Sequence, residues 1–534
     1  MIKTKVIDNF TGSMTPQING DMNSGQSYWL DVFGYDPFTK PRNLTWNETQ
    51  TQIDSGGSII TDLVMAGKVR NESGIIYVYA IGHLGRLYKI QVNDPTIFNP
   101  NYDNPVLLAT LTGGSPTFTR GAFIDFFGST ERIYISHDKG VTRINFDGTS
   151  ETVVGVEASW TQNVPKPLQQ FLGALYIGHG TNLARIDSTA TVTTYAQLSP
   201  ALPVGFQIRD IDLSLDGTYL QMVVTNLALS SLIATTPDTG MTTPSNSYLI
   251  QWNGIDTGYT SSTFFNNTIL TSSILSGDSH YIFGYDNFSN VLYNPIQKLV
   301  TSLPDVVGGS TLPNAVFSTG NLVYWAQTLT YLGADYALFQ CYGSLADQSH
   351  PEGFWTPHFL PAVSPETDII QIPMFMLVSS LGRGGTVNGY ASGIYGVPKV
   401  YYSTLEISST TTTYRFYKWS LYPTGLSVPI NGALFQTQNQ VFSKKINVKE
   451  VRVYGQPWVT NNIFTIDLIG SNDAVINGGT QTFTAGTNLT VGEDFAWFNP
   501  AMEPIYSLAL RITNTGTVNH IINKVEIDYT EGGK

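Results

Sequence analysis

Hydrophobic and polar residues alternate with a period of two through the last hundred residues of the chain. In "IYSLALRI" the residues Tyr506, Leu508 and Leu510 fall on one face, and "KVEIDY" alternates charged with apolar positions in the same way. This alternation predicts strands that are buried on one face. Because such strands need a second layer over their apolar face, we expect residues 436–534 to form a small β-sandwich.

Further upstream, one hairpin pattern occurs three times, in "YAIGHLGRLYKIQ", "YISHDKGVTRINF" and "LYIGHGTNLARID". Aligned on His83, His137 and His179, each copy reads Ile, Gly or Ser, His, three residues, Leu or Val, one residue, Lys or Arg, and Ile. A weaker fourth copy, "IFGYDNFSNVLYN", has Tyr285 at the histidine position. β-branched and aromatic residues flank turn-forming residues in every copy, which predicts strand, tight turn and strand.

The hairpins recur at intervals of about 40 to 60 residues, a period typical of the blades of a β-propeller. We predict a propeller of about seven blades in residues 71–435, with a β-helix as the second choice because its repeats are shorter. Residues 1–70 are polar with a few aromatic anchors. They are predicted to form an extended N-terminal arm.

Composition supports an all-β fold. Only 13% of the residues are charged, whereas 42% are hydrophobic and the chain contains 50 glycines and 27 prolines. The net charge is −13, and the longest basic run is Lys444-Lys445. A duplex-binding surface needs clustered basic residues, so nucleic-acid binding is disfavoured, although passage of DNA through an acidic pore is compatible with this charge.

Targeting signals are few. The start "MIKTKVIDNF" lacks the apolar core of a secretory signal, which favours synthesis in a cytoplasm. The longest apolar run, residues 369–378, is interrupted by Gln371 and Pro373 and is far shorter than the roughly 20 residues that span a bilayer, so no membrane insertion is expected. The single cysteine, Cys341, excludes an intrachain disulfide and is predicted to be a buried strand residue.

Candidate chemistry is sparse. Hairpin histidines in successive blades are far apart unless they line the axis, so His83, His137 and His179 are predicted to be structural rather than metal ligands. The set His350, Glu352 and His358 has ligand-like spacing, but its prolines and aromatics favour a long loop. We therefore predict no catalytic residues, no metal, no cofactor and no enzymatic activity.

Two further patterns have structural and functional interpretations. "LSLDGTYL" is similar to the aspartate-box hairpin of sialidase propellers, but it lacks the tryptophan and occurs once, which favours a plain hairpin. The aromatic groups around Trp252 in "NSYLIQWNG" and Trp497 in "EDFAWFNP" could stack on sugars. Aromatics at strand spacing are more often core residues, so both are predicted to be buried.

The layout of arm, propeller and sandwich resembles the tail hub and nozzle proteins of short-tailed bacteriophages. Phrases such as "GRLYKI" (residues 85–90) and the paired strands "IYSLALRI" and "INKVEIDY" (residues 505–529) are similar to those of that family. The resemblance covers nearly the whole chain. It implies a virion structural protein of the tail that assembles with portal-adjacent or other tail proteins and conducts the genome during ejection.

If the resemblance holds, we expect a homo-oligomeric ring, six- or twelve-fold, around a channel between subunits with a neutral-to-negative lining. DNA would be passing cargo only. Two alternatives stay open: a carbohydrate- or receptor-binding propeller such as a tail-associated adhesin or lectin, and a propeller glycosidase, whose two carboxylates the sequence cannot place.

Overall fold

The computed structural model divides the chain into two compact units. The propeller unit comprises Thr51–Leu338 and Pro361–Lys418, and the sandwich unit comprises Met1–Gln50, Phe339–Leu360 and Trp419–Lys534. The structure describes residues 2–8, 10, 29–33, 43–46, 51–55, 58–60, 62–73, 75–93, 105–118, 121–154, 160–161, 164–189, 191–195, 202, 205–226, 246–266, 268–276, 279–286, 290–294, 299–302, 313–319, 322–331, 334–343, 354–359, 370–378, 399–407, 412–420, 429, 432–437, 439–471 and 473–532.

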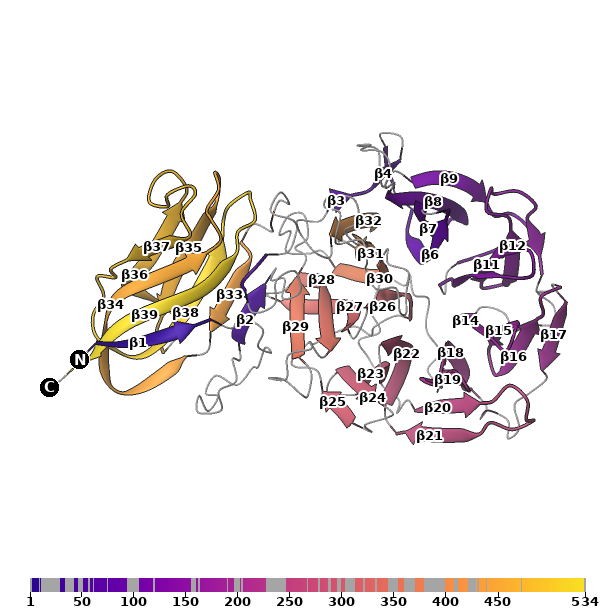
Figure 1. Ribbon diagram of the computed structural model, residues 1–534. Helices are drawn as coiled ribbons and strands as arrows, with labels where there is room; N and C mark the ends of the chain where they lie inside the picture. The colour runs from indigo at the N-terminus through magenta and orange to yellow at the C-terminus, as the bar shows by residue number, and fades with distance from the viewer. Residues whose placement is uncertain are drawn as a thin grey trace. The chain divides into compact units, whose positions relative to one another are not determined.

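The described strands of the propeller form seven blades, five of which are separate four-stranded sheets (Figure 1). Blade one contains β6 (Val64–Glu72), β7 (Ile75–Gly82), β8 (Arg86–Asn93) and β9 (Pro105–Thr110). Blade two contains β10 (Ile124–Phe127), β11 (Arg132–His137), β12 (Gly140–Ile144) and β13 (Thr152–Val153). Blade three contains β14 (Leu168–Phe171), β15 (Ala174–His179), β16 (Asn182–Ile186) and β17 (Val192–Tyr195). Blade four contains β18 (Gln207–Leu213), β19 (Leu220–Thr225), β20 (Ser247–Trp252) and β21 (Ser261–Phe265). Blade five contains β22 (Thr268–Ser276), β23 (Ser279–Asp286), β24 (Asn290–Asn294) and β25 (Leu299–Ser302). The predicted all-β propeller is therefore confirmed.

Blades six and seven belong to one eight-stranded sheet. Blade six contains β26 (Val316–Thr319), β27 (Leu322–Tyr331) and β28 (Ala334–Gly343). Blade seven contains β30 (Ile370–Val378), β31 (Lys399–Ile407), β32 (Thr412–Ser420) and β3 (Thr51–Gln52). The eighth strand of the sheet, β29 (Phe354–Phe359), falls in the segment that belongs to the sandwich unit. The two blades join where β28 and β30 run parallel, with Asp335 opposite Ile370.

The first strands of neighbouring blades contact one another around a closed ring, from β6 through β10, β14, β18, β22, β26 and β30 back to β6. The ring closes because β3, from the N-terminal part of the chain, supplies the last strand of blade seven. Thr51 lies opposite Lys418 and Gln52 opposite Tyr417, and the Ile53 amide donates to the carbonyl of Phe416 at 2.9 Å. A short hairpin of β4 (Asp54–Ser55) and β5 (Ser58–Ile59) follows.

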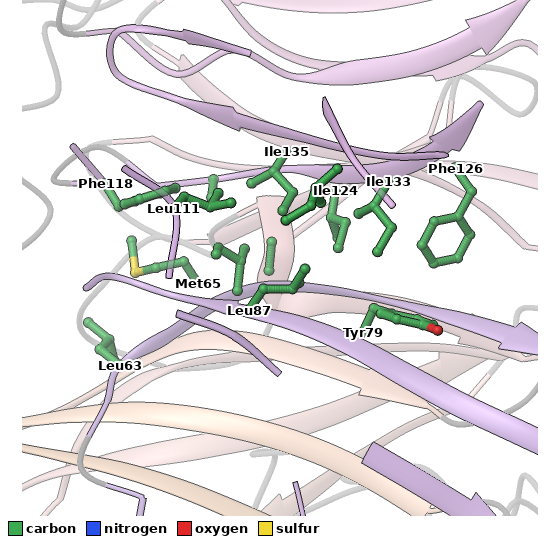
Figure 2. Packing of buried hydrophobic residues seen from close by; sticks show 14 of the residues in the cluster. Leu63, Met65, Tyr79, Leu87, Leu111, Phe118, Ile124, Phe126, Ile133 and Ile135 are labelled. Atoms are coloured by element: carbon green, nitrogen blue, oxygen red, sulfur yellow. The ribbon is translucent and has the colours of Figure 1, made fainter. Parts of the chain in front are cut away.

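The blades pack face to face through apolar side chains. Between blades one and two, side chains from both sheets form one buried cluster (Figure 2) that includes Leu63, Met65, Tyr79, Leu87, Ile124, Phe126, Ile133 and Ile135. Sheets covered on both faces carry apolar residues on both faces, which explains why the propeller strands lack the clean alternation of the C-terminal strands. Burial of each such aliphatic side chain contributes about 1.5–3 kcal/mol.

The sandwich consists of two sheets. The first sheet contains β1 (Ile2–Ile7), β39 (Ile522–Glu531), β34 (Gln440–Gly455) and β37 (Phe495–Phe498). The second sheet contains β2 (Trp29–Phe33), β33 (Leu434–Thr437), β38 (Ile505–Asn514), β35 (Ile463–Ile469) and β36 (Val475–Thr484). The rings of Phe483 and Phe498, one from each sheet, lie 6.0 Å apart in the core.

The predicted alternation is present in β39, whereas in β38 four consecutive residues, 507–510, are buried. Leu508, Leu510, Val525 and Ile527 are buried, as their spacing indicated. Tyr506 is 56% exposed. Tyr506 lies near the start of β38. There the pairing of β38 with the long strand β34 shifts in register between Val441 and Ile446, where β34 passes from one sheet to the other.

The unit boundaries differ from the predicted divisions at residues 70 and 435. The described residues before Gln50 belong to the sandwich unit: β1 pairs with β39, β2 pairs with β33, and Leu44 forms a bridge with Ile522. The propeller unit begins at Thr51, and its last segment ends at Lys418. Composition could not show this, because strand pairing between the two ends of a long chain leaves no local signal.

Candidate functional site

The short helix η3 (Pro313–Ala315) precedes β26, the first strand of blade six. η3 contacts the first strands β6, β22 and β30. The Asn314 amide donates to the carbonyl of Met65 at 3.0 Å and to the carbonyl of Ala122, so it ties blade six to blades one and two.

A polar group links the first strands of blades one, two and three. The Asp125 carboxylate, which is almost fully buried, accepts from the Lys68 ammonium and from the Gln170 amide at 3.0 Å. The Gln170 amide also donates to the carbonyl of Phe126 at 2.6 Å. The carboxylate is thus bound from blade one on one side and from blade three on the other, which suits a role in holding the blades together.

The three repeated histidines occupy equivalent positions in three different blades. His83 follows β7, and His137 and His179 end β11 and β15, so each lies at the turn between the second and third strands of its blade. Tyr285 of the fourth copy lies near the end of β23, the second strand of blade five. The pattern marks one structural unit.

His83 and His179 anchor the segment that leads into the first strand of the same blade, whereas His137 bonds to Thr142 and Lys139 in its own hairpin. Nδ1 of His83 accepts the Leu63 amide at 3.0 Å, and Nδ1 of His179 accepts the Thr161 amide at 3.3 Å. Each ring also packs on an aromatic side chain: Tyr414 at 4.4 Å for His83, Phe118 at 5.8 Å for His137, and Trp160 at 4.9 Å for His179.

His179 is fully buried beside a buried lysine. The Lys166 ammonium donates to the carbonyls of Asp138 at 2.5 Å and Val164 at 3.2 Å, and so joins the hairpin of blade two to the segment before β14. Burial, with a smaller effect of the Lys166 charge, lowers the pKa of His179 to about 4. The ring is therefore neutral at pH 7, as the packing on Trp160 requires.

Among the described residues, no group of three His, Cys, Asp or Glu side chains could hold a metal ion. His350 and Glu352 lie outside the described residues, and His358 lies in β29, where the structure does not describe the side chain. Cys341 lies in β28, and its burial is likewise not described. Within the described part of the chain, no helix is long and apolar enough to cross a membrane.

The arrangement closest to acid–base chemistry lies between blades four and five. Ser273 Oγ lies 2.8 Å from Nε2 of His280, and Asp212 Oδ2 lies 3.7 Å from the same nitrogen. A catalytic triad needs the hydroxyl and the carboxylate on opposite ring nitrogens. This geometry therefore does not activate the serine.

The neighbouring Asp210 has a pKa well above its usual range, chiefly because it is buried. Its two oxygens accept the backbone amides of Ile211 at 2.9 Å and Ser273 at 2.7 Å, which joins blade four to blade five. Asp212, two residues along β18, is the nearest second carboxylate in sequence. Because Asp210 is only 8% exposed and both its oxygens are bound to backbone, the pair gives no site at which a substrate could reach the acid.

The sequence similar to an aspartate box forms a hairpin turn between β18 and β19. Ser214 Oγ donates to Asp216 at 2.6 Å and accepts the Tyr219 amide at 2.9 Å, and Gly217 has a φ of 70°. Hydrogen bonds from Ser214 and Thr218 lower the pKa of Asp216 to about 2. The segment is a structural turn, as predicted.

Sequence reasoning missed that this turn belongs to a set. In three Asp-x-Thr turns the aspartate accepts the amide two residues later: Thr149 to Asp147 at 2.9 Å, Thr189 to Asp187 at 2.9 Å, and Thr218 to Asp216 at 3.1 Å. The turns lie in blades two, three and four. The signal was present in the sequence as "DGT", "DST" and "DGT".

The two candidate aromatic groups have opposite environments. Trp252 is buried in blade four, where its Nε1–H donates to the carbonyl of Asp256 at 2.7 Å, as predicted for a core residue. Trp497 is 54% exposed on the outer face of the first sheet of the sandwich. The prediction that it belongs to the core is wrong, because β37 turns Ala496 and Phe498 inward instead.

No protein-family model and no curated protein matches the chain. It is similar in fold to a chain of the mitotic checkpoint complex, with 12% identity and a TM-score of 0.39, over 71% of this chain and 93% of that one. It is also similar in fold to the Neurospora crassa Pan2 WD40 domain, with 7% identity and a TM-score of 0.34, over 68% of this chain and 91% of that one. It is similar in fold to YjhT as well, with 11% identity and a TM-score of 0.32, over 55% of this chain and 97% of that one. These likenesses carry no functional argument.

Proposed function

We propose that this protein is a structural component of a bacteriophage tail, a hub or nozzle subunit that assembles into a ring and conducts the genome between subunits. The observation that carries this proposal is the layout of a seven-bladed propeller joined to a β-sandwich, which resembles the tail proteins of short-tailed phages. The link that Asn314 makes from blade six to blades one and two, across the ring of first strands, favours a passage outside the propeller.

Charge supports the same role. A DNA conduit must not hold the polyanion, and clustered Lys and Arg on the wall would bind phosphates through counterion release. The chain has 40 acidic and 27 basic residues and a net charge of −13. We expect subunits to close the ring through head-to-tail contacts and to present a neutral-to-negative wall to the duplex.

Light scattering and electron microscopy of the purified full chain test the assembly. We expect closed rings of six or twelve subunits, alone or after addition of the neighbouring tail proteins. Monomers under both conditions would contradict the proposal. The glycosidase alternative has no support at Asp210 and Asp212, whereas the exposed Trp497 favours carbohydrate binding as a second function.

A further inference from the structure

The outer face of the first sandwich sheet exposes an aromatic surface at its edge. β37 lies at this edge and pairs with β34, with Phe495 opposite Tyr454 and Trp497 opposite Arg452. Alternation turns Ala496 and Phe498 into the core, so Phe495 and Trp497 point outward. Trp497 keeps more than half of its side chain in solvent, which is unusual for a residue that dominates protein cores and interfaces.

The polar side chains around these aromatics are held in place by one another. The Arg452 guanidinium lies 2.7 Å from an Asp528 oxygen, and the Lys524 ammonium lies 2.8 Å from Glu526. The Tyr454 hydroxyl donates to Glu526 at 3.0 Å. Lys524 also lies 4.2 Å from the centre of the Tyr454 ring. Each of the two cations is therefore balanced by a carboxylate, and Glu450 and Asp8 lie near Arg452 and Lys524 as further carboxylates.

This balance selects the charge of a ligand. An anion would compete with Asp528 for Arg452, and a cation would compete with Lys524 for Glu526, so either would have to break an ion pair. A neutral ligand with hydroxyl groups can add hydrogen bonds to the remaining donor and acceptor sites without breaking one.

The extent of the apolar surface argues against a protein partner. Across the strands of the sheet, Trp497 lies opposite Arg452, Arg452 opposite Glu526, and Glu526 opposite Val6. Val6 is the next exposed apolar residue along this line, so two charged residues separate it from Trp497. Stable protein interfaces need a continuous contact of about 800 Å² on each partner. A single exposed indole with ordered polar neighbours suits a ligand the size of one or two rings.

We infer that Phe495, Trp497, Tyr454 and Arg452 form a binding platform for a neutral carbohydrate, with Trp497 as the stacking surface. The face of an indole ring carries negative potential, which attracts the C–H bonds on one side of a pyranose. The hydroxyl groups at the rim of the sugar then reach Arg452 and Glu526. This inference does not depend on the conduit role.

The test uses the full chain on an array of neutral and sialylated oligosaccharides, followed by calorimetric titration of the strongest neutral ligand. We expect binding to neutral glycans, a loss of at least about tenfold in affinity for Trp497→Ala, since one good contact of 1.4 kcal/mol is tenfold, and partial retention for Trp497→Phe. Tyr506→Ala, a matched exposed aromatic of the same unit outside this platform, should bind as the wild type does.

Circular dichroism and thermal melting of each variant confirm that the fold is intact. Three outcomes would overturn the inference: no binding to any neutral glycan, binding to sialylated glycans alone, or equal affinity of Trp497→Ala and the wild type. A change in sedimentation of Trp497→Ala without a change in glycan binding would show a protein contact instead, and would also overturn it.

Discussion

The propeller and the sandwich differ in how far apart in the chain most of their paired strands lie. Six blades consist of consecutive strands, and blade seven takes one strand, β3, from earlier in the chain. The first sheet of the sandwich instead pairs β1 with β39, so the two ends of the chain form one sheet. Local pairing repeats a pattern that the sequence displays, whereas long-range pairing carries a larger loop-closure cost and leaves no repeated pattern.

The largest effect should come from breaking the long-range closure at Trp46. This side chain is fully buried, and its Nε1–H donates to Nε2 of His520 at 3.0 Å. The amide of Asn519 donates to the carbonyl of Trp46 at 2.8 Å. Trp46→Ala should destabilise the sandwich by about 3–5 kcal/mol, the usual cost of emptying a large aromatic site.

Hydrogen exchange should locate that effect. In Trp46→Ala we expect faster exchange in β38 and β39 and unchanged exchange in the first strands of the blades. Equal acceleration in the propeller would mean that the two units do not unfold as separate units.

A smaller effect should follow from pH, through the buried histidines. Burial lowers the pKa of His179 to about 4 and that of His520 to about 3, from 6.5. Below pH 6.5 the unfolded state binds a proton that the folded state does not, so stability is full above 6.5 and falls as the pH falls toward each folded pKa. The loss should be at most about 1.4 kcal/mol per pH unit for each histidine.

Carboxylates titrate in the same range, so a matched variant is needed. Chemical denaturation of the wild type and His179→Gln between pH 7 and 4 should show a shallower slope in the variant. Identical slopes would show that His179 is not buried in its neutral form.

The smallest effect should come from Lys166, which strengthens the contact between blades two and three. Lys166→Met keeps the buried stem but removes the hydrogen bonds that the ammonium donates to the carbonyls of Asp138 and Val164, at a cost of about 1–3 kcal/mol. Removal of the charge should also raise the pKa of His179, because the lysine lowers it. A histidine titration followed by NMR checks the second effect, and an unchanged or lower pKa would contradict the contact.

These differences also explain what could be predicted from the sequence. The histidine hairpins repeat with one residue pattern, so their strands, turns and structural role followed from it. The partners of β1, β2 and β3 lie hundreds of residues away, and no local feature indicates them. Trp252 and Trp497 stand in similar aromatic contexts, and only their strand register decides that one is buried and the other exposed.

The most direct test of the proposed conduit is a cryo-electron microscopy map of the assembled oligomer. The map should show a closed ring whose channel runs between subunits, is wide enough for a DNA duplex and has a neutral-to-negative wall. A strongly basic lumen, an open passage along the propeller axis, or the absence of any ring would contradict the proposal.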